Sequence, residues 1–231
     1  MTEFTTWRSL VDGTEISAIP DSVVLQARAS ELDLNDGDSV TSWPDISGDG
    51  NDLSTDSGDP SYHEDVINGE PVVRSHGNET MTADIGTIEM PFAISYVSAV
   101  VDDDSNEIVA SDDSEDNRIG YRSQNGNNRI LIRIDGSQTD IDISQDTTNF
   151  HIFTYWYKEN DTEVRVNGET VDSGISGTAT WENINVMSRP GGDAGFAGDL
   201  PEFVFDQNAD TSDNIESIES DLSSRYGITL E

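Results

Sequence analysis

The chain has 231 residues, of which 47 are acidic and 11 are basic, so its formal charge at neutral pH is −36. This charge excludes direct binding to nucleic acid, because no basic stripe is present to neutralise phosphates. The absence of cysteine excludes disulfide bonds and thiolate chemistry. No run approaches the ~18 apolar residues of a membrane helix, so membrane insertion is not expected.

The types of charged residue indicate which class of organism the protein comes from. Asp outnumbers Glu by 30 to 17, and Lys158 is the only lysine beside ten arginines. This composition is typical of proteins from extreme halophiles, in which salt screens the repulsion between surface carboxylates. The alternative is an ordinary acidic protein of a mesophile.

The first 22 residues stand apart as an N-terminal arm. Phe4, Trp7, Leu10 and Ile16 are apolar at mixed spacing. We expect the arm to dock on a partner or on a second copy of the chain, which would make a homo-oligomer; the alternative is a first strand of the same domain. Residues 1–9 have neither the basic start nor the apolar stretch of an export signal, so no leader is predicted.

Beyond the arm, short alternating runs separated by turn residues predict an all-β domain. The clearest strands are residues 92–101, 129–134, 150–157, 163–166 and 203–205. In residues 129–134 every second residue is isoleucine, which places one face of that strand in a core.

A single helix is predicted over residues 212–226. Ile215, Ile218, Leu222 and Tyr226 fall on one face of it, and Gly227 suits the left-handed conformation that commonly ends a helix. Since no helical partner is predicted, this apolar face should pack on a sheet.

Several segments in order resemble the laminin-G-like and concanavalin-A-like jelly-roll domains. Residues 43–52 are similar to the family's W-x-D-x-S-G-x-G-N loop, and residues 67–74 to its ING-x-P-x-V-R segment. Residues 92–96, 164–168 and 196–205 resemble three of its later strands. The resemblance implies an all-β jelly-roll β-sandwich over residues 23–231 that includes the C-terminal helix.

A dense group of oxygen ligands lies in the loop of residues 45–52. Asp45, Asp49 and Asp52 are candidate ligands for Ca²⁺ or another hard cation, although the domain requires no cofactor. The alternative is a turn in which these side chains accept hydrogen bonds from their own backbone. The acidic residues at 102–104 and 112–113 are interpreted as solvated turns.

Aromatic and paired acidic residues suggest two kinds of carbohydrate chemistry. Tyr62, Tyr121 and Trp181 are candidates for exposed rings that stack on a sugar. Glu159 and Glu163 have the spacing of a glycoside-hydrolase acid pair, but polar residues separate them where a hairpin must turn. We therefore interpret them as part of a solvated turn and expect no enzymatic activity.

These observations favour a structural or surface protein of a virion that infects a halophilic host, such as a turret, spike, decoration or tail component. It would be made in the host cytoplasm, contact other virion proteins and recognise host-surface glycans. The first alternative is a secreted carbohydrate-binding module on the surface of a halophilic cell, and the second is a concanavalin-fold glycoside hydrolase.

Overall fold

The computed structural model describes residues 19–101, 106–114, 116–122, 128–190 and 195–231, together with the backbone of two short strands, β1 (Leu10–Val11) and β2 (Thr14–Glu15). The side chains of Phe4, Trp7, Leu10 and Ile16 lie outside the described residues. The predicted arm therefore stays a prediction.

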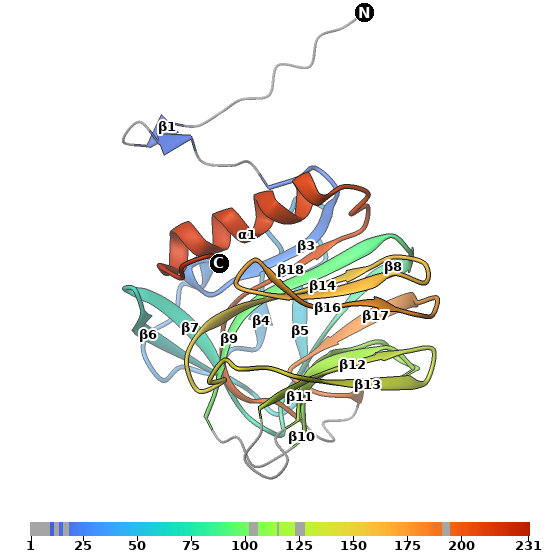
Figure 1. The fold of residues 1–231 in the computed structure, drawn as a ribbon. Helices are drawn as coiled ribbons and strands as arrows, with labels where there is room; N and C mark the ends of the chain where they lie inside the picture. The colour runs from blue at the N-terminus through green and yellow to red at the C-terminus, as the bar shows by residue number, and fades with distance from the viewer. Residues whose placement is uncertain are drawn as a thin grey trace, which may run out of the picture.

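Two antiparallel sheets pack face to face (Figure 1). The first, here called the β8 sheet, has the order β13 (Ser137–Asp142), β12 (Arg129–Ile134), β11 (Arg118–Arg122), β10 (Asn106–Ser111), β17 (Thr180–Val186), β8 (Thr80–Glu89), β5 (Leu53–Ser57) and β4 (Ser42–Trp43).

The second, the β9 sheet, has the order β16 (Glu169–Ile175), β15 (Thr162–Val166), β14 (His151–Tyr157), β9 (Phe92–Val100), β18 (Ala197–Asp206), β7 (Glu70–His76) and β6 (Ser61–Ile67). One more strand, β3 (Val23–Arg28), pairs with the second half of β18 and leads into a short 3₁₀ turn, η1 (Ala29–Glu31).

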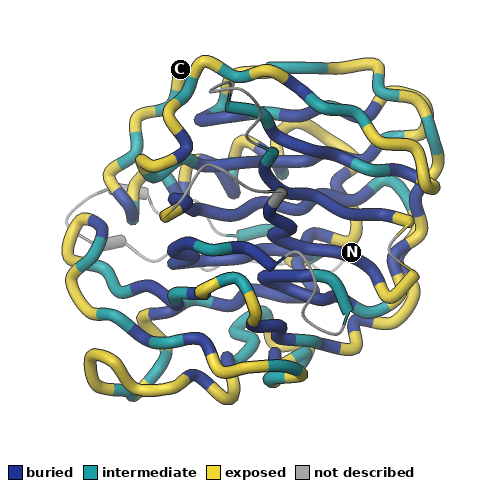
Figure 2. The backbone as a smooth tube through the Cα atoms, turned by 90° about the horizontal axis from the view of Figure 1, so that it is seen from below, coloured by how far each residue is buried: buried dark blue, intermediate teal, exposed yellow. Residues whose placement is uncertain are grey.

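Apolar side chains from both sheets fill the space between them, and Figure 2 shows the buried backbone in the middle of the molecule with the exposed segments at its turns. An aromatic cluster lies at the centre of this core. Phe92 stacks on Tyr157 at a centroid distance of 4.5 Å, and Trp181 of the opposite sheet meets Phe205 edge-on at 5.8 Å. Alternation along the strands thus puts one face of each sheet in a shared core.

The C-terminal helix α1 (Ser212–Tyr226) covers the outer face of the β9 sheet. Ile218, Leu222 and Tyr226 pack there against Val97, and Gly227 ends the helix at φ +66°. This second apolar layer explains why every residue of β9 is buried, since both faces of the strand are covered. The predicted helix and the two-sheet sandwich are confirmed.

A group of buried ions fastens the end of α1 to the sheet. The Glu202 carboxylate is fully buried and accepts hydrogen bonds from Gln26, Arg28 and Tyr226, at 2.6, 3.1 and 2.8 Å. Arg225 of the helix lies 3.3 Å from the same carboxylate. Removing one partner would leave a buried charge uncompensated, so these contacts hold the helix in one position.

Candidate functional site

A polar hollow opens on the outer face of the β8 sheet. It has a volume of about 530 Å³ and is lined by residues of β5, β8, β17, the turn after β10 and the segment after β17: Asp56, Thr82, Ala83, Asp84, Asp113, Asn183, Asn185 and Pro190. Most of these side chains are carboxylates, amides and hydroxyls. The hollow therefore offers hydrogen-bond donors and acceptors on a surface whose scaffold is a rigid sheet.

An irregularity in the pairing of β8 with β17 shapes this hollow. Glu182 pairs with Thr87 and Ile184 with Ala83, so Asn183 alone faces three residues of β8. Asn183 adopts φ +57°, a left-handed conformation that asparagine tolerates better than most residues. Such bulges redirect side chains that a regular strand would place elsewhere.

The Asp113 carboxylate lies between two amides at the rim. Asn183 Nδ2 donates to Asp113 Oδ2 at 2.7 Å, and Asn185 Nδ2 donates to Asp113 Oδ1 at 3.0 Å. Each carboxylate oxygen keeps a lone pair for another donor, and the half-buried Asn183 keeps its carbonyl as an acceptor, whereas Asn185 is buried. This arrangement suits a ligand rich in hydroxyl groups, because a hydroxyl both donates and accepts.

The three aromatic residues expected to stack on sugars are buried, so that prediction is wrong. Trp181 is fully buried in the core between the sheets. The Tyr121 hydroxyl is hydrogen-bonded to Ser98, and its ring meets Phe153 edge-on at 5.2 Å. Tyr62 is 7% exposed. Each points from its strand towards the core, where large aromatic rings bury the most apolar surface.

The loop at Asp45 is a hydrogen-bonded turn. Asp45 accepts from the backbone N–H groups of Gln26, Ser47, Gly50 and Asn51, at 2.9 to 3.1 Å, and from the Ser47 hydroxyl at 2.7 Å. Partial burial opposes ionisation of this carboxyl, but the donors outweigh it and lower its pKa.

The other two candidate ligands of this loop do not join Asp45 around a cation. Asp52 accepts from the Asp45 N–H at 2.8 Å, and Asp49 is exposed. Within the described ranges, no three acidic or histidine side chains are grouped to hold a metal. The geometry therefore favours the turn and corrects the candidate Ca²⁺ site.

The acidic turn at residues 112–113 is only partly solvated. Asp112 is 2% exposed and accepts from Asn117 Nδ2 at 2.7 Å and from Ser114 Oγ at 2.9 Å. Burial raises the pKa of Asp112 despite these hydrogen bonds. The interpretation as a solvated turn is wrong for Asp112, whereas residues 102–104 lie outside the described part of the chain.

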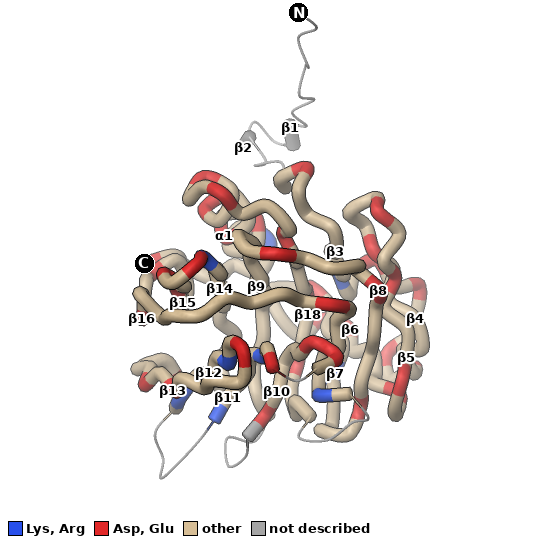
Figure 3. Tube along the Cα trace, turned by 90° about the vertical axis from the view of Figure 1, so that its right-hand side faces the viewer, with Lys and Arg blue, Asp and Glu red and all other residues tan. Residues whose placement is uncertain are grey.

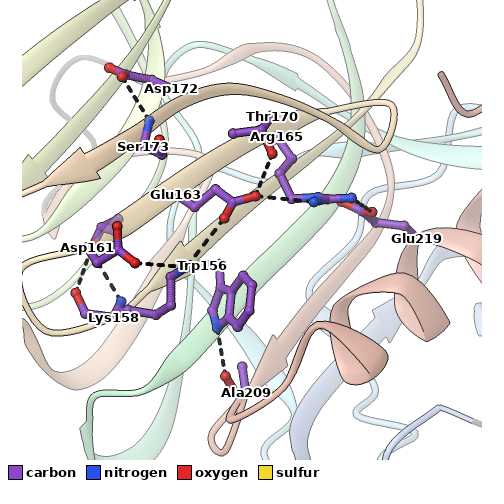
Figure 4. Close-up of polar contacts among 11 residues, drawn as sticks. Trp156, Lys158, Asp161, Glu163, Arg165, Thr170, Asp172, Ser173, Ala209 and Glu219 are labelled. Carbon is purple, nitrogen blue, oxygen red and sulfur yellow. Dashed lines mark hydrogen bonds and ion pairs between the residues drawn. The ribbon is translucent and has the colours of Figure 1, made fainter.

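Glu159 and Glu163 occupy different environments, and Figure 4 shows the contacts of Glu163. Glu159 lies on the turn between β14 and β15 and is exposed. Glu163, by contrast, is on β15, where it accepts from Thr170 Oγ1 at 2.6 Å, Arg165 Nη1 at 3.2 Å and Lys158 Nζ at 3.3 Å. The interpretation of both acids as solvated is therefore wrong for Glu163.

The partners of Glu163 also fix its ionisation. Its partial burial opposes the charged form, but the hydrogen bonds from Thr170, Arg165 and Lys158 prevail and hold the pKa of Glu163 below its ordinary value. Arg165 continues the network to Glu219 of α1 at 3.0 Å. A carboxyl held ionised in this way is unsuited to donate the proton that a glycoside hydrolase supplies.

One arrangement that the sequence did not suggest joins Ser61, His63 and Asp36. Ser61 Oγ lies 3.0 Å from His63 Nε2, and His63 Nδ1 lies 3.1 Å from Asp36 Oδ1. This is the order of groups in a serine nucleophile activated by histidine. Spacing could not reveal it, because Asp36 comes from a loop 27 residues away from His63.

Donors of three described residues around Ser61 already have acceptors. The nearby N–H groups of Tyr62 and Val40 already donate to backbone carbonyls. Arg74, which pairs with Ser61 across the strands, gives its guanidinium to Asp199 at 2.6 and 2.9 Å. A single oxyanion donor contributes a factor of ~10² to 10³ in rate, so a serine without such donors is a poor nucleophilic site.

Comparisons with known proteins identify the class of fold. No protein-family model and no curated protein matches the sequence. Among solved structures, domain 4 of AbnA, a GH43 extracellular arabinanase from Geobacillus stearothermophilus solved in complex with arabinotriose, is similar with a TM-score of 0.63. The identity is 12%, over 88% of this chain and 98% of that one.

Two further structures are similar over part of their own length. A GH54 α-L-arabinofuranosidase matches with a TM-score of 0.65 and 12% identity, over 90% of this chain and 61% of that one. The receptor-binding domain of botulinum neurotoxin D matches with a TM-score of 0.59 and 12% identity, over 88% and 53%. At such identities the likeness shows the fold alone, which is a concanavalin-A-like β-sandwich, as predicted.

Proposed function

We propose that this chain is a non-catalytic carbohydrate-binding module that works at a cell surface or outside the cell. The observation that carries the proposal is the polar hollow on the β8 sheet, in which Asp113 and Asn183 present hydrogen-bonding groups and the buried Asn185 holds Asp113 in place. Groups of this kind recognise hydroxyls, and a site on a rigid sheet holds them without a large ordering cost.

The compared structures support this class of ligand. The arabinanase domain was solved with arabinotriose, and the toxin domain is described as receptor-binding. None of the three compared structures is a virion protein, so they fit the surface module better than the virion component that the sequence favoured. No helix in the described part of the chain has the length and apolar character needed to cross a bilayer.

The proposal that the module is not an enzyme rests on two sites. Glu163 is held ionised by Thr170, Arg165 and Lys158, and the N–H groups of Tyr62 and Val40 near Ser61 already donate to backbone carbonyls. We expect no release of reducing sugar from arabinan and no release of nitrophenol from its acetate ester above the rate of a Ser61→Ala variant. Turnover that Ser61→Ala or Glu163→Gln abolishes, in a folded protein, would overturn this part.

Glycan recognition is tested by titrating the protein with arabinotriose and by screening a glycan array. Asp113→Ala removes the acceptor of both rim amides, so we expect a loss of at least tenfold in affinity for whichever glycan binds. Asp210→Ala, an exposed change in the turn before α1, is the matched control and should have no effect. If no glycan binds, or if both variants bind like the parent, the proposal fails.

The cellular location is tested separately. Mass spectrometry of the envelope fraction and of purified particles from the same culture should find the chain in the envelope. Enrichment in the particles would instead support the virion assignment, and it would leave the hollow as a candidate receptor site.

A further inference from the structure

A row of polar residues crosses the outer face of the β8 sheet. Cross-strand pairing links, in order, Thr82, Asn185, Ser111, Arg118, Arg133 and Gln138. The row begins in the hollow, which Thr82 and Asn185 line, and ends at the exposed Gln138. Asn185, Ser111 and Arg118 are buried, so a ligand can contact the row at Thr82 and at Arg133 and Gln138 but not in its middle.

The far end of this row is basic, in a chain that is otherwise strongly acidic. Four of the ten arginines lie on the two adjacent strands β11 and β12: Arg118, Arg122, Arg129 and Arg133. Figure 3 shows blue segments at these strands while acidic residues are spread over the rest of the molecule. Two of the four are neutralised by β13, since Arg122 Nη1 lies 2.7 Å from Asp140 and Arg129 is paired with Asp142.

Arg133 differs from its neighbours. Its cross-strand partners are Arg118 on one side and the neutral Gln138 on the other. No carboxylate in the described part of the chain forms an ion pair with it, and its Nε is buried without an acceptor. Like charges directly opposite each other destabilise a sheet, and an unsatisfied buried donor adds a further cost.

The charge along the row therefore changes from negative at the hollow to positive at the opposite end. The hollow carries Asp56, Asp84 and Asp113, whereas the opposite end carries Arg133 beside Arg118. Three strand spacings separate Asn185 from Arg133, which is roughly 14 Å. A ligand that contacts both ends must be an oligomer, with hydroxyls towards the carboxylates and a negative group towards the guanidinium.

We propose that Arg133 is a specificity-determining residue that binds the carboxylate of an acidic oligosaccharide whose neutral part occupies the hollow. The inference rests on the proposed function and adds to it the charge of the ligand. The planar guanidinium can donate two parallel hydrogen bonds to a carboxylate, which matches the shape of that group as well as its charge.

The test compares a trisaccharide that has one terminal uronic acid and two neutral sugars with its methyl ester, because esterification removes the charge and keeps the sugar rings. Affinities are measured by calorimetry at one fixed salt concentration for the parent, Arg133→Gln, Arg133→Lys and Arg129→Gln. We expect the acid to bind at least tenfold more tightly than the ester. Arg133→Gln should remove this difference and leave ester binding unchanged, and Arg133→Lys should keep part of it.

Arg129→Gln is the matched control, since it removes the same charge from the same strand face but from a residue that already has a carboxylate partner. An equal loss in Arg129→Gln and Arg133→Gln would show a diffuse charge effect and overturn the assignment to Arg133. Equal binding of acid and ester would overturn the inference while glycan recognition stands. Failure of both sugars to bind, with no other glycan bound on the array, would contradict the proposed function itself.

Discussion

The loop at Asp45 offers a sharp test of the interpretation as a turn. Replacing Asp45 by alanine removes the acceptor of four backbone N–H groups and one hydroxyl. A hydrogen bond to a charged group contributes about 1.5–3 kcal/mol, but water can reach part of this loop and replace some of the lost acceptors. We therefore expect the free energy of unfolding to fall by about 2–4 kcal/mol, a large share of the ~5–15 kcal/mol of an ordinary domain.

The effect should depend on pH in a defined direction. The folded protein holds the pKa of Asp45 below the value of about 3.9 expected in the unfolded chain. The stabilisation is therefore fully present above about pH 4 and is lost as the pH falls through the lower, folded pKa. The difference in stability between the parent and Asp45→Asn should shrink in the same pH range.

Urea unfolding in molar salt, followed by circular dichroism, measures both effects. Asp49→Ala is the control in the same loop, because Asp49 is exposed, and it should change stability by less than ~0.5 kcal/mol. The urea unfolding is repeated with Ca²⁺ and with a chelator, and neither should change the free energy of unfolding of the parent protein. Equal stability of Asp45→Ala and the parent would refute the reasoning, and a Ca²⁺-dependent gain lost in Asp45→Ala would restore the cation site.

Four other outcomes are expected. Far-UV circular dichroism should show unfolding in ~10 mM salt and a β-rich spectrum in molar salt, because the Debye length falls from ~30 to ~3 Å; identical spectra would contradict this. Trp181→Ala should cost about 3–5 kcal/mol in thermal melts and leave the glycan affinity of the folded fraction unchanged. Glu163→Gln should lower the melting temperature while Glu159→Gln does not, and equal melting of the two would count against the network at Glu163. Deletion of residues 1–20 should leave a folded sandwich that no longer self-associates by light scattering, and unchanged assembly would remove the arm from the mechanism.

Local patterns were enough to predict the helix and the clearest strands. Residues 129–134 form a strand because alternation within six residues already separates the two faces, and residues 212–226 form a helix because its apolar stripe and Gly227 are both local. Alternation does not say which face of a strand meets the opposite sheet. The sequence therefore predicts an exposed Trp181, whereas its side chain lies in the aromatic core.

The candidate site could not be predicted in the same way. The hollow depends on a bulge that becomes visible only when β17 is paired with β8, about 100 residues earlier in the chain. Likewise, the contrast between Arg129 and Arg133 depends on which residue of β13 faces each of them. Cross-strand partners are set by tertiary register, which a single sequence does not display.

The position of β18 bears on how the chain is made. This strand lies between β9 on one side and β7 and β3 on the other, and its Glu202 meets Arg28 across 174 residues of sequence. During synthesis on the ribosome, the edges of β9, β7 and β3 that pair with β18 therefore stay unpaired until residues 197–206 emerge. A nascent chain stalled before that point has no complete second sheet, so chaperone binding should peak there and fall once β18 is inserted.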